Sequence, residues 1–251
     1  MNIRAVTLAE RPELQHRIGE LEAEAFPPYI NAEPTWGECF PLILSAFPEL
    51  QLFVVDADRD ALLAVASAVA FRWDGATANL PGYNDLLRRC LDENRRGVAA
   101  NTLCGIMAIT PEEHQGKGVA RHLFAAVFDL IHAQGFEHFV IPVRPTLKHL
   151  YPNFSTEDYL SWKATDGRPF DPWIRSNMAL SPQLLGIARD SIEVSAPIPQ
   201  WEEWCGMQFP ASGRYVIPGG HQLLVVDRVA GTARYAEDHI WFEYPIAGPD
   251  A

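Results

Sequence analysis

Residues 115–120, with the sequence QGKGVA, combine two glycines with the start of an apolar helical pattern. Because glycine has no Cβ, backbone N–H groups in such a turn can approach an anion closely. The dipole of the helix that follows adds partial positive charge at the same place. The segment therefore predicts a phosphate site that uses backbone groups and needs no basic surface. A tight strand–helix turn without a ligand would also use these glycines.

Two common phosphate motifs do not fit this segment. The pattern GxxxxGK[ST] is absent, and the fingerprint GxGxxG would start at Gly116 but has Arg121 where its third glycine belongs. The pattern Q/R-x-x-G-x-G/A does fit, with Gln115, Gly118 and Ala120 at its defined positions. Here the chain resembles the GNAT superfamily of N-acetyltransferases, in which this loop holds the pyrophosphate of acetyl-CoA.

The resemblance implies acetyl-CoA, or another acyl-CoA, as a co-substrate. In that superfamily two parallel strands splay apart, and the pantetheine arm lies in the gap between them. The arm would pair here with the main chain near Met107, Ala108 and Ile109. The residues that the resemblance implies for the phosphates are Gln115, Gly116, Lys117, Gly118, Val119 and Ala120.

The resemblance also implies a tyrosine after the second parallel strand as general acid for the departing thiolate. Tyr151 stands at that place, and a phenol with a pKa of about 10 can protonate a thiolate with a pKa of about 8.5. The glycine-phenylalanine that usually follows is replaced by Pro152-Asn153-Phe154. A packing role for the Tyr151 ring is an equally good reading of this segment.

Attack of an amine on a thioester requires a neutral nitrogen, so a carboxylate or a histidine must accept a proton. The candidates for this general base are Glu33 and Glu38, at the entry to a helix, together with His149 and Asp158. We expect an N-acyltransferase that moves an acetyl group from acetyl-CoA to an amine within a ternary complex. Two alternatives stay open: a catalytically silent CoA-thioester-binding sensor or assembly protein, and an acyltransferase that uses a longer acyl-CoA or an acyl carrier protein.

The acidic composition is compatible with a cationic partner such as a small-molecule or peptide amine, although on charge alone it is better explained by the ordinary solubility of a cytosolic protein. The 251 residues carry 20 Lys and Arg against 32 Asp and Glu, a formal net charge of −12, which disfavours nucleic acid and anionic membranes as partners. Four scattered cysteines predict reduced thiols, and no metal-ligand motif is present. Without a signal-peptide pattern or an apolar run of about 18 residues, the chain is expected to be cytoplasmic.

Hydrophobic periodicity predicts the elements that position this chemistry. The fold class expected is a mixed α/β sheet of GNAT type, an antiparallel meander followed by a βαβ unit with splayed parallel strands. Thr7 and Glu10 form a capping-box pattern that predicts a helix start. The main elements expected are strands at 2–7, 51–56, 61–73, 102–110 and 137–143, and helices at 36–47, 84–93 and 118–134.

The chain is longer than this arrangement needs. We expect residues 1–155 to form the acyl-CoA-binding core and residues 156–251 an extension of the same domain. A strand at 191–195 and a hairpin pairing 222–228 with 236–244 would complete the sheet. The aromatic residues of the extension suggest a wall of the acceptor pocket or the surface of a homodimer.

Overall fold

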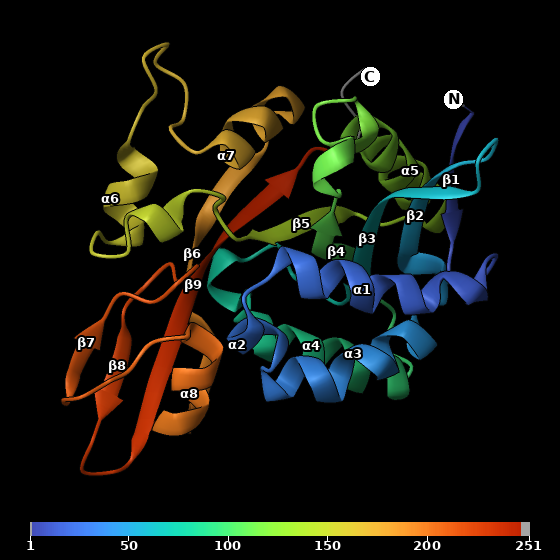
Figure 1. Cartoon of the computed structure of the whole chain (residues 1–251). Coiled ribbons are helices and arrows are strands. Elements are labelled where there is room, and N and C mark those ends of the chain that lie inside the picture. Colours follow the sequence, from blue (N-terminus) through green and yellow to red (C-terminus); the bar gives the residue numbers. More distant parts are fainter. Residues whose placement is uncertain (1, 247–251) are drawn as a thin grey trace.

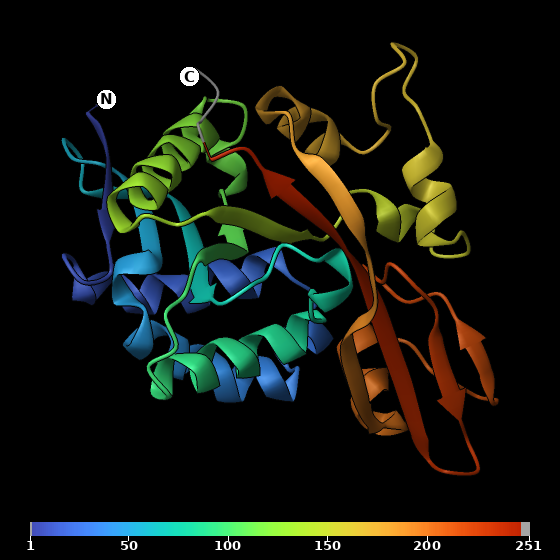
Figure 2. The ribbon, with the colours of Figure 1, turned by 180° about the vertical axis from the view of Figure 1, so that it is seen from behind.

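The computed structural model describes residues 2–246, and within them nine strands form one mixed sheet (Figures 1 and 2). Its order is β1-β2-β3-β4-β5-β9-β8-β7, and β6 pairs with β9. The strands are β1 (Ile3–Thr7), β2 (Gln51–Asp56), β3 (Ala61–Phe71), β4 (Thr102–Ile109), β5 (His138–Val143), β6 (Gln183–Pro197), β7 (Gly213–Tyr215), β8 (Leu224–Asp227) and β9 (Thr232–Tyr244). The α-helices are α1 (Gln15–Ala25), α2 (Pro28–Asn31), α3 (Pro34–Ala46), α4 (Tyr83–Arg95), α5 (Val119–Gln134), α6 (Thr156–Ser161), α7 (Pro172–Asn177) and α8 (Ile198–Cys205).

Helices cover both faces of the N-terminal part of the sheet. Helix α5 packs on β1, β2 and β3, while α1, α3 and α4 lie on the opposite face (Figures 1 and 2). The predicted apolar stripe of α5 is buried, including Val119, Leu123, Val127 and Ile131. Because both faces of β2 and β3 are covered, these two strands are almost entirely apolar and buried, as their composition predicts.

The parallel pair β4 and β5 diverges, as expected for a GNAT-type fold. The two strands pair only from Thr102 to Cys104, opposite His138 to Val140. After Cys104 the two strands separate, and a gap opens between them. The sheet nevertheless continues, because the opposite edge of β5 pairs with β9. On its far side β4 stays paired with β3, and a bulge at Ile106 interrupts that ladder.

Three sequence expectations need correction. Thr7 and Glu10 do exchange hydrogen bonds, but they close a turn, and α1 begins only at Gln15 after a 3₁₀ turn that starts at Pro12. The strand expected at 191–195 is the second half of the longer β6. In the terminal hairpin β8 pairs only with residues 232–234 of β9, and the rest of β9 pairs with β6 and β5.

The sheet crosses the predicted boundary at residue 155, because β9 forms a ladder with β5. Helix α8 and the strands β7 and β8 lie at the far end of β9, away from α5 (Figure 1). None of the helices within residues 2–246 is long and apolar enough to cross a membrane.

Candidate active site

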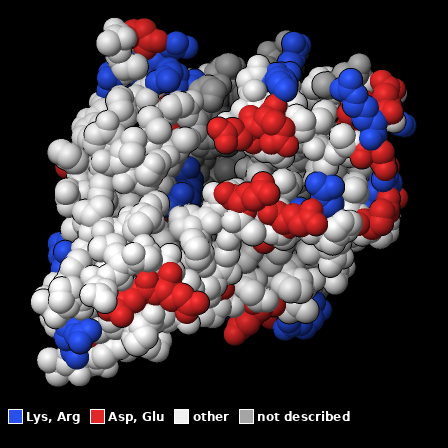
Figure 3. Space-filling model, in the orientation of Figure 1, with Lys and Arg blue, Asp and Glu red and all other residues white. Residues whose placement is uncertain are grey.

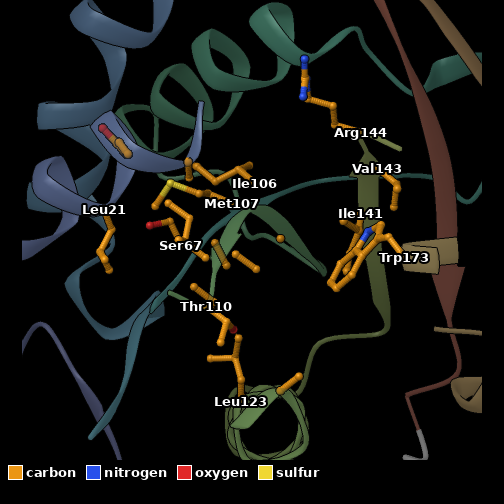
Figure 4. Close-up of a pocket in the computed structure, with 18 of the residues that line it drawn as sticks. Leu21, Ser67, Ile106, Met107, Thr110, Leu123, Ile141, Val143, Arg144 and Trp173 are labelled. Atoms are coloured by element: carbon orange, nitrogen blue, oxygen red, sulfur yellow. The ribbon is translucent and has the colours of Figure 1, made fainter. Parts of the chain in front are cut away.

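A cavity of about 1090 Å³ is lined by β4 and β5 where these strands diverge (Figure 4). Residues of α1, α3 and α4 line one part of it, and the loop before α5 lines another. Pockets for one drug-sized ligand measure roughly 300–1,000 Å³. The cavity is therefore large enough for parts of two substrates at once.

The predicted phosphate loop forms one end of this cavity. Gly116 and Gly118 both adopt left-handed backbone, with φ of 70° and 78°, a conformation that favours glycine. The Gln115 amide donates a hydrogen bond to the carbonyl of Thr110 at 3.0 Å and fixes the loop to the end of β4. Helix α5 begins at the next residue, Val119, so its first amides lie at the loop.

All but one of the residues predicted to contact the acyl donor line the cavity. The exception, Lys117, is exposed. The Ile106 bulge is held from the other side, where the Tyr83 hydroxyl donates to the Ile106 carbonyl at 2.9 Å. The predicted donor contacts that line the cavity are Met107, Ala108, Ile109, Gln115, Gly116, Gly118, Val119 and Ala120.

The structure does not bring Tyr151 to the cavity. Its ring packs edge-on against Trp162 and Phe170, with ring centroids 4.9 and 5.7 Å away. The buried Lys148 ammonium fixes this loop by donating to the carbonyls of Tyr151 and Phe154, at 3.1 and 2.9 Å. The side chain predicted as general acid is thus part of a separate aromatic cluster.

Of the predicted bases, only Glu33 lines the cavity, and both of its carboxylate oxygens are engaged. Its Oε2 accepts from the backbone N–H of Trp36 at 2.7 Å and caps α3, while Oε1 accepts from the Asn84 amide at 3.1 Å. The other candidates lie outside the cavity lining: Glu38 is exposed on α3, His149 contacts a backbone carbonyl, and Asp158 is bonded to Ser155.

These contacts predict a structural role for Glu33. We expect Glu33→Ala to lower the free energy of unfolding by about 1–2 kcal/mol, because α3 loses its N-cap and Asn84 its partner. Urea denaturation measures this change. Glu38→Ala, an exposed position on the same helix, should change stability by less than about 0.5 kcal/mol. Unchanged stability together with lost acetyl transfer in Glu33→Ala would instead make Glu33 a catalytic residue.

Several buried polar atoms without a partner meet at this cavity. A buried donor or acceptor without a hydrogen bond costs roughly 1–3 kcal/mol, so such atoms are few in folded proteins. Within the described residues, those that belong to cavity-lining side chains are Glu22 Oε1, Ser67 Oγ, Asn84 Oδ1 and His239 Nδ1. Their concentration at one place indicates a site whose ligand supplies the missing partners.

Glu22 of α1 is the site residue that sequence reasoning missed. Burial raises its pKa to about 7, and only the Trp36 side chain opposes this shift. One signal was available in the sequence: Glu22 follows the buried Ile18 by four residues and Leu21 by one. It therefore lies on the apolar face of α1, where ionisable side chains are rare unless they have a partner or a function.

The wall beside Glu22 is aromatic and the rim of the cavity is acidic. Trp36 lies 6.2 Å from Tyr83, centroid to centroid, and Tyr83 stacks on His239 at 5.2 Å. Figure 3 shows acidic side chains above and below a hollow in this face, with basic surface beside it. The charged residues of the cavity lining are Glu22, Glu24, Glu33, Glu112, Glu113 and Arg144.

Known proteins share this architecture. No protein-family model matches the chain. The chain is 25% identical to the arginine N-acetyltransferase avaD of Aspergillus versicolor, over 96% of this chain and 93% of the relative. The loading GNATL domain of CurA from Lyngbya majuscula has a TM-score of 0.58 at 13% identity, with 98% of both chains covered. The GNAT-like decarboxylase GphF, solved with isobutyryl-CoA, has a TM-score of 0.56 at 15% identity and covers 98% of this chain.

Nearly the whole chain takes part in these likenesses, including most of the region after residue 155. The solved structures share its fold, and the relative from Aspergillus is named as an N-acetyltransferase. With the diverging parallel strands and the glycine loop before α5, the chain has the GNAT-type fold of these solved structures, and over nearly its whole length it is similar to a protein named as an N-acetyltransferase.

Proposed function

We propose that this protein transfers the acetyl group of acetyl-CoA to the amino group of a small cationic acceptor of the arginine type. One observation carries the proposal: a single cavity joins the glycine loop at the start of α5 to an acidic chamber beside α1. A phosphorylated donor and a cationic amine would each meet groups of opposite charge at the two ends.

The donor end relies on backbone groups. The amides of the 115–120 loop and the first turn of α5 would hold the pyrophosphate. From Gly105 onward the edge of β4 that faces β5 has no strand partner within the described residues. The pantetheine arm would pair with that edge, and an amide near the Ile106 bulge would polarise the thioester carbonyl.

The acceptor end suits a guanidinium group. Three of the five glutamates in the cavity lining lie at this end, Glu22 and Glu24 on α1 and Glu33 at the start of α3. Asn84 Oδ1 is a buried acceptor without a partner, whereas a guanidinium carries five N–H donors. The partly exposed Trp36 ring adds an aromatic surface beside which a cation binds favourably. The similarity to a relative named arginine N-acetyltransferase supports the same acceptor.

Glu22 is the group best suited to accept the amine proton. A base works best when its pKa lies near the working pH, and the pKa of Glu22 is raised to about 7. Glu22 would take one proton from the ammonium, after which the neutral nitrogen attacks the thioester carbon. The C–N bond forms, the C–S bond breaks, and a second nitrogen proton neutralises the thiolate, so that the products are the acetylamide and CoA.

The test combines binding with turnover. We expect calorimetry to show acetyl-CoA binding, and we expect arginine to cause release of one CoA thiol per molecule acetylated. Binding of acetyl-CoA without thiol release for arginine and a panel of other amines would contradict the proposal and favour a silent CoA-thioester sensor. Faster release from longer acyl-CoAs than from acetyl-CoA would contradict the choice of donor.

A further inference from the structure

Arg144 follows β5 directly and lines the cavity. Its guanidinium is held along one edge: Nε donates to Glu237 Oε1 at 2.6 Å, and Nη2 donates to Glu237 Oε2 at 3.2 Å and to the Gly219 carbonyl at 3.0 Å. The remaining nitrogen, Nη1, has no hydrogen bond to any of the described residues. About a fifth of the side chain stays exposed. Nε and Nη2 are thus fixed, while Nη1 can meet a ligand.

Arg144 and its partner Glu237 both stay ionised. Glu237 lies on β9 and is fully buried. Burial alone would raise its pKa, but the Arg144 charge and then the nearby histidines lower that pKa to about 2. The Tyr235 hydroxyl donates to the same carboxylate at 2.5 Å. Arg144 is therefore a rigid, permanently charged donor, and little conformational entropy would be lost when it binds a ligand.

A second polar side chain lies at the same end of the cavity. His239 follows Glu237 by two residues on β9, so both project from one face of the strand. Only 3% of His239 is exposed, its Nδ1 has no hydrogen-bond partner, and it lines the cavity. Burial lowers its pKa to about 4, so the ring is neutral at pH 7 and offers one donor and one acceptor nitrogen.

The two ends of the acceptor chamber have opposite charge. Figure 4 shows Arg144 beyond the end of β5, across the gap from Ile106 and Met107 of β4, while Leu21 of α1 lies on the other side of those residues. Glu22 is the next residue of α1. A ligand that spans the chamber would therefore meet a carboxylate near α1 and a guanidinium near β9.

We propose that Arg144, assisted by His239, binds the carboxylate of the acceptor, so that the substrate is a free basic amino acid and not a simple amine. This inference rests on the proposed function, since it assigns the acceptor of the same site. Arg144 can donate to a carboxylate through Nη1, and a charge-assisted hydrogen bond of this kind is stronger than one between neutral groups. The acceptor's α-amino group would then face Glu22, and its cationic side chain would lie along the aromatic wall.

Agmatine tests this assignment on the unaltered protein, because it keeps the primary amine and the guanidinium of arginine and lacks only the carboxylate. We expect calorimetry with CoA-saturated protein to show arginine binding about 30-fold more tightly than agmatine, the contribution of a charge-assisted hydrogen bond. Argininamide, whose carboxylate is replaced by a neutral amide, should bind like agmatine. Equal binding of arginine and agmatine, or no binding of arginine, would overturn the inference.

A conservative substitution then locates the effect. Arg144→Lys retains a charge for Glu237 but loses the Nη1 donor, so the preference for arginine over agmatine should fall to about threefold or less. Arg89→Lys is the matched control, because Arg89 also bonds a carboxylate (Glu93) and a backbone carbonyl (Arg72) but lies outside the cavity lining. A preference that survives in Arg144→Lys would contradict the role of Arg144.

Turnover separates this inference from the proposed function. If arginine binds more tightly than agmatine but neither is acetylated, the proposed reaction fails while the carboxylate site stands. If both are acetylated with equal kcat/KM and bind equally, the reaction stands and the carboxylate site fails. Thermal unfolding of Arg144→Lys, measured beside the wild type, shows whether the variant is folded under the assay conditions.

Discussion

Replacing Gly118 by glutamate is expected to abolish acetyl-CoA binding in a chain that still folds. Gly118 immediately precedes α5 and has a φ of 78°, and a Cβ added there would meet no atom within 4 Å. The cost to folding is therefore only the strain of a left-handed non-glycine residue, about 1–2 kcal/mol. The new carboxylate, however, would stand where the phosphates of CoA are proposed to bind, and like charges repel. Calorimetric titration with acetyl-CoA measures the loss.

Gly135 provides a matched control at the other end of the same helix. It ends α5 with a φ of 70°, and a Cβ there would also meet nothing within 4 Å. Gly135→Glu should therefore show a similar loss of stability in urea and unchanged acetyl-CoA binding. If Gly118→Glu still binds acetyl-CoA as tightly as the wild type, or if both variants lose binding equally, the loop at 115–120 is not the phosphate site.

The strand–loop–helix unit could be predicted from sequence because its signals are local. All of them lie within about thirty residues: the apolar periodicity of α5, the glycines Gly116 and Gly118 before it, and the left-handed Gly135 that ends it. The predicted donor contacts consequently fall on the cavity wall, apart from Lys117. These contacts are also easier to predict because they are backbone groups. The position of a backbone group follows directly from the position of its strand or helix.

The acceptor end could not be predicted in this way, because its residues come together only through long-range pairing. Arg144 and Glu237 are 93 positions apart and meet because β9 pairs with β5. Nothing in the composition of residues 183–190 indicated that β6 would extend through them, since that extension depends on the ladder with β9. Tyr151 was placed by a resemblance, and local aromatic packing determines where its ring lies.

The glutamates illustrate the same distinction. The position of Glu33 before a helix makes it a candidate base in the sequence, and the same position makes it the N-cap whose carboxylate is occupied. Glu22 is one of three alternating glutamates in the sequence, and only its distance of four residues from Ile18 distinguishes it, because that spacing places it on the buried face of α1. A charged residue at an apolar-face position is therefore a stronger sign of function here than one at a helix end.

We expect Glu22→Gln to lower kcat for arginine acetylation by about 10²–10⁴-fold, the usual contribution of a general base. In the wild type, activity should fall as the pH drops through about 7, because protonation of Glu22 removes the base. In Glu22→Gln that decline should disappear, and acetyl-CoA binding should be unchanged. Glu20→Gln, an exposed residue of the same helix that pairs with Arg17, should retain wild-type activity and the wild-type pH profile.

The same substitution should stabilise the protein at alkaline pH, which a purely structural glutamate would not do. Because burial raises the folded-state pKa of Glu22 above its unfolded value, its contribution to stability is fully present below about pH 4 and is lost as the pH rises through about 7. At pH 8 the wild type carries a half-buried charge that glutamine lacks. The Tm of Glu22→Gln should therefore exceed that of the wild type at pH 8, and the difference should shrink as the pH is lowered.

A lower Tm of Glu22→Gln at pH 8, with kcat nearly unchanged, would show that Glu22 stabilises the fold and does not take part in the reaction. A gain of stability together with a loss of activity is instead what a catalytic carboxylate produces, because such a group lowers stability for the sake of function.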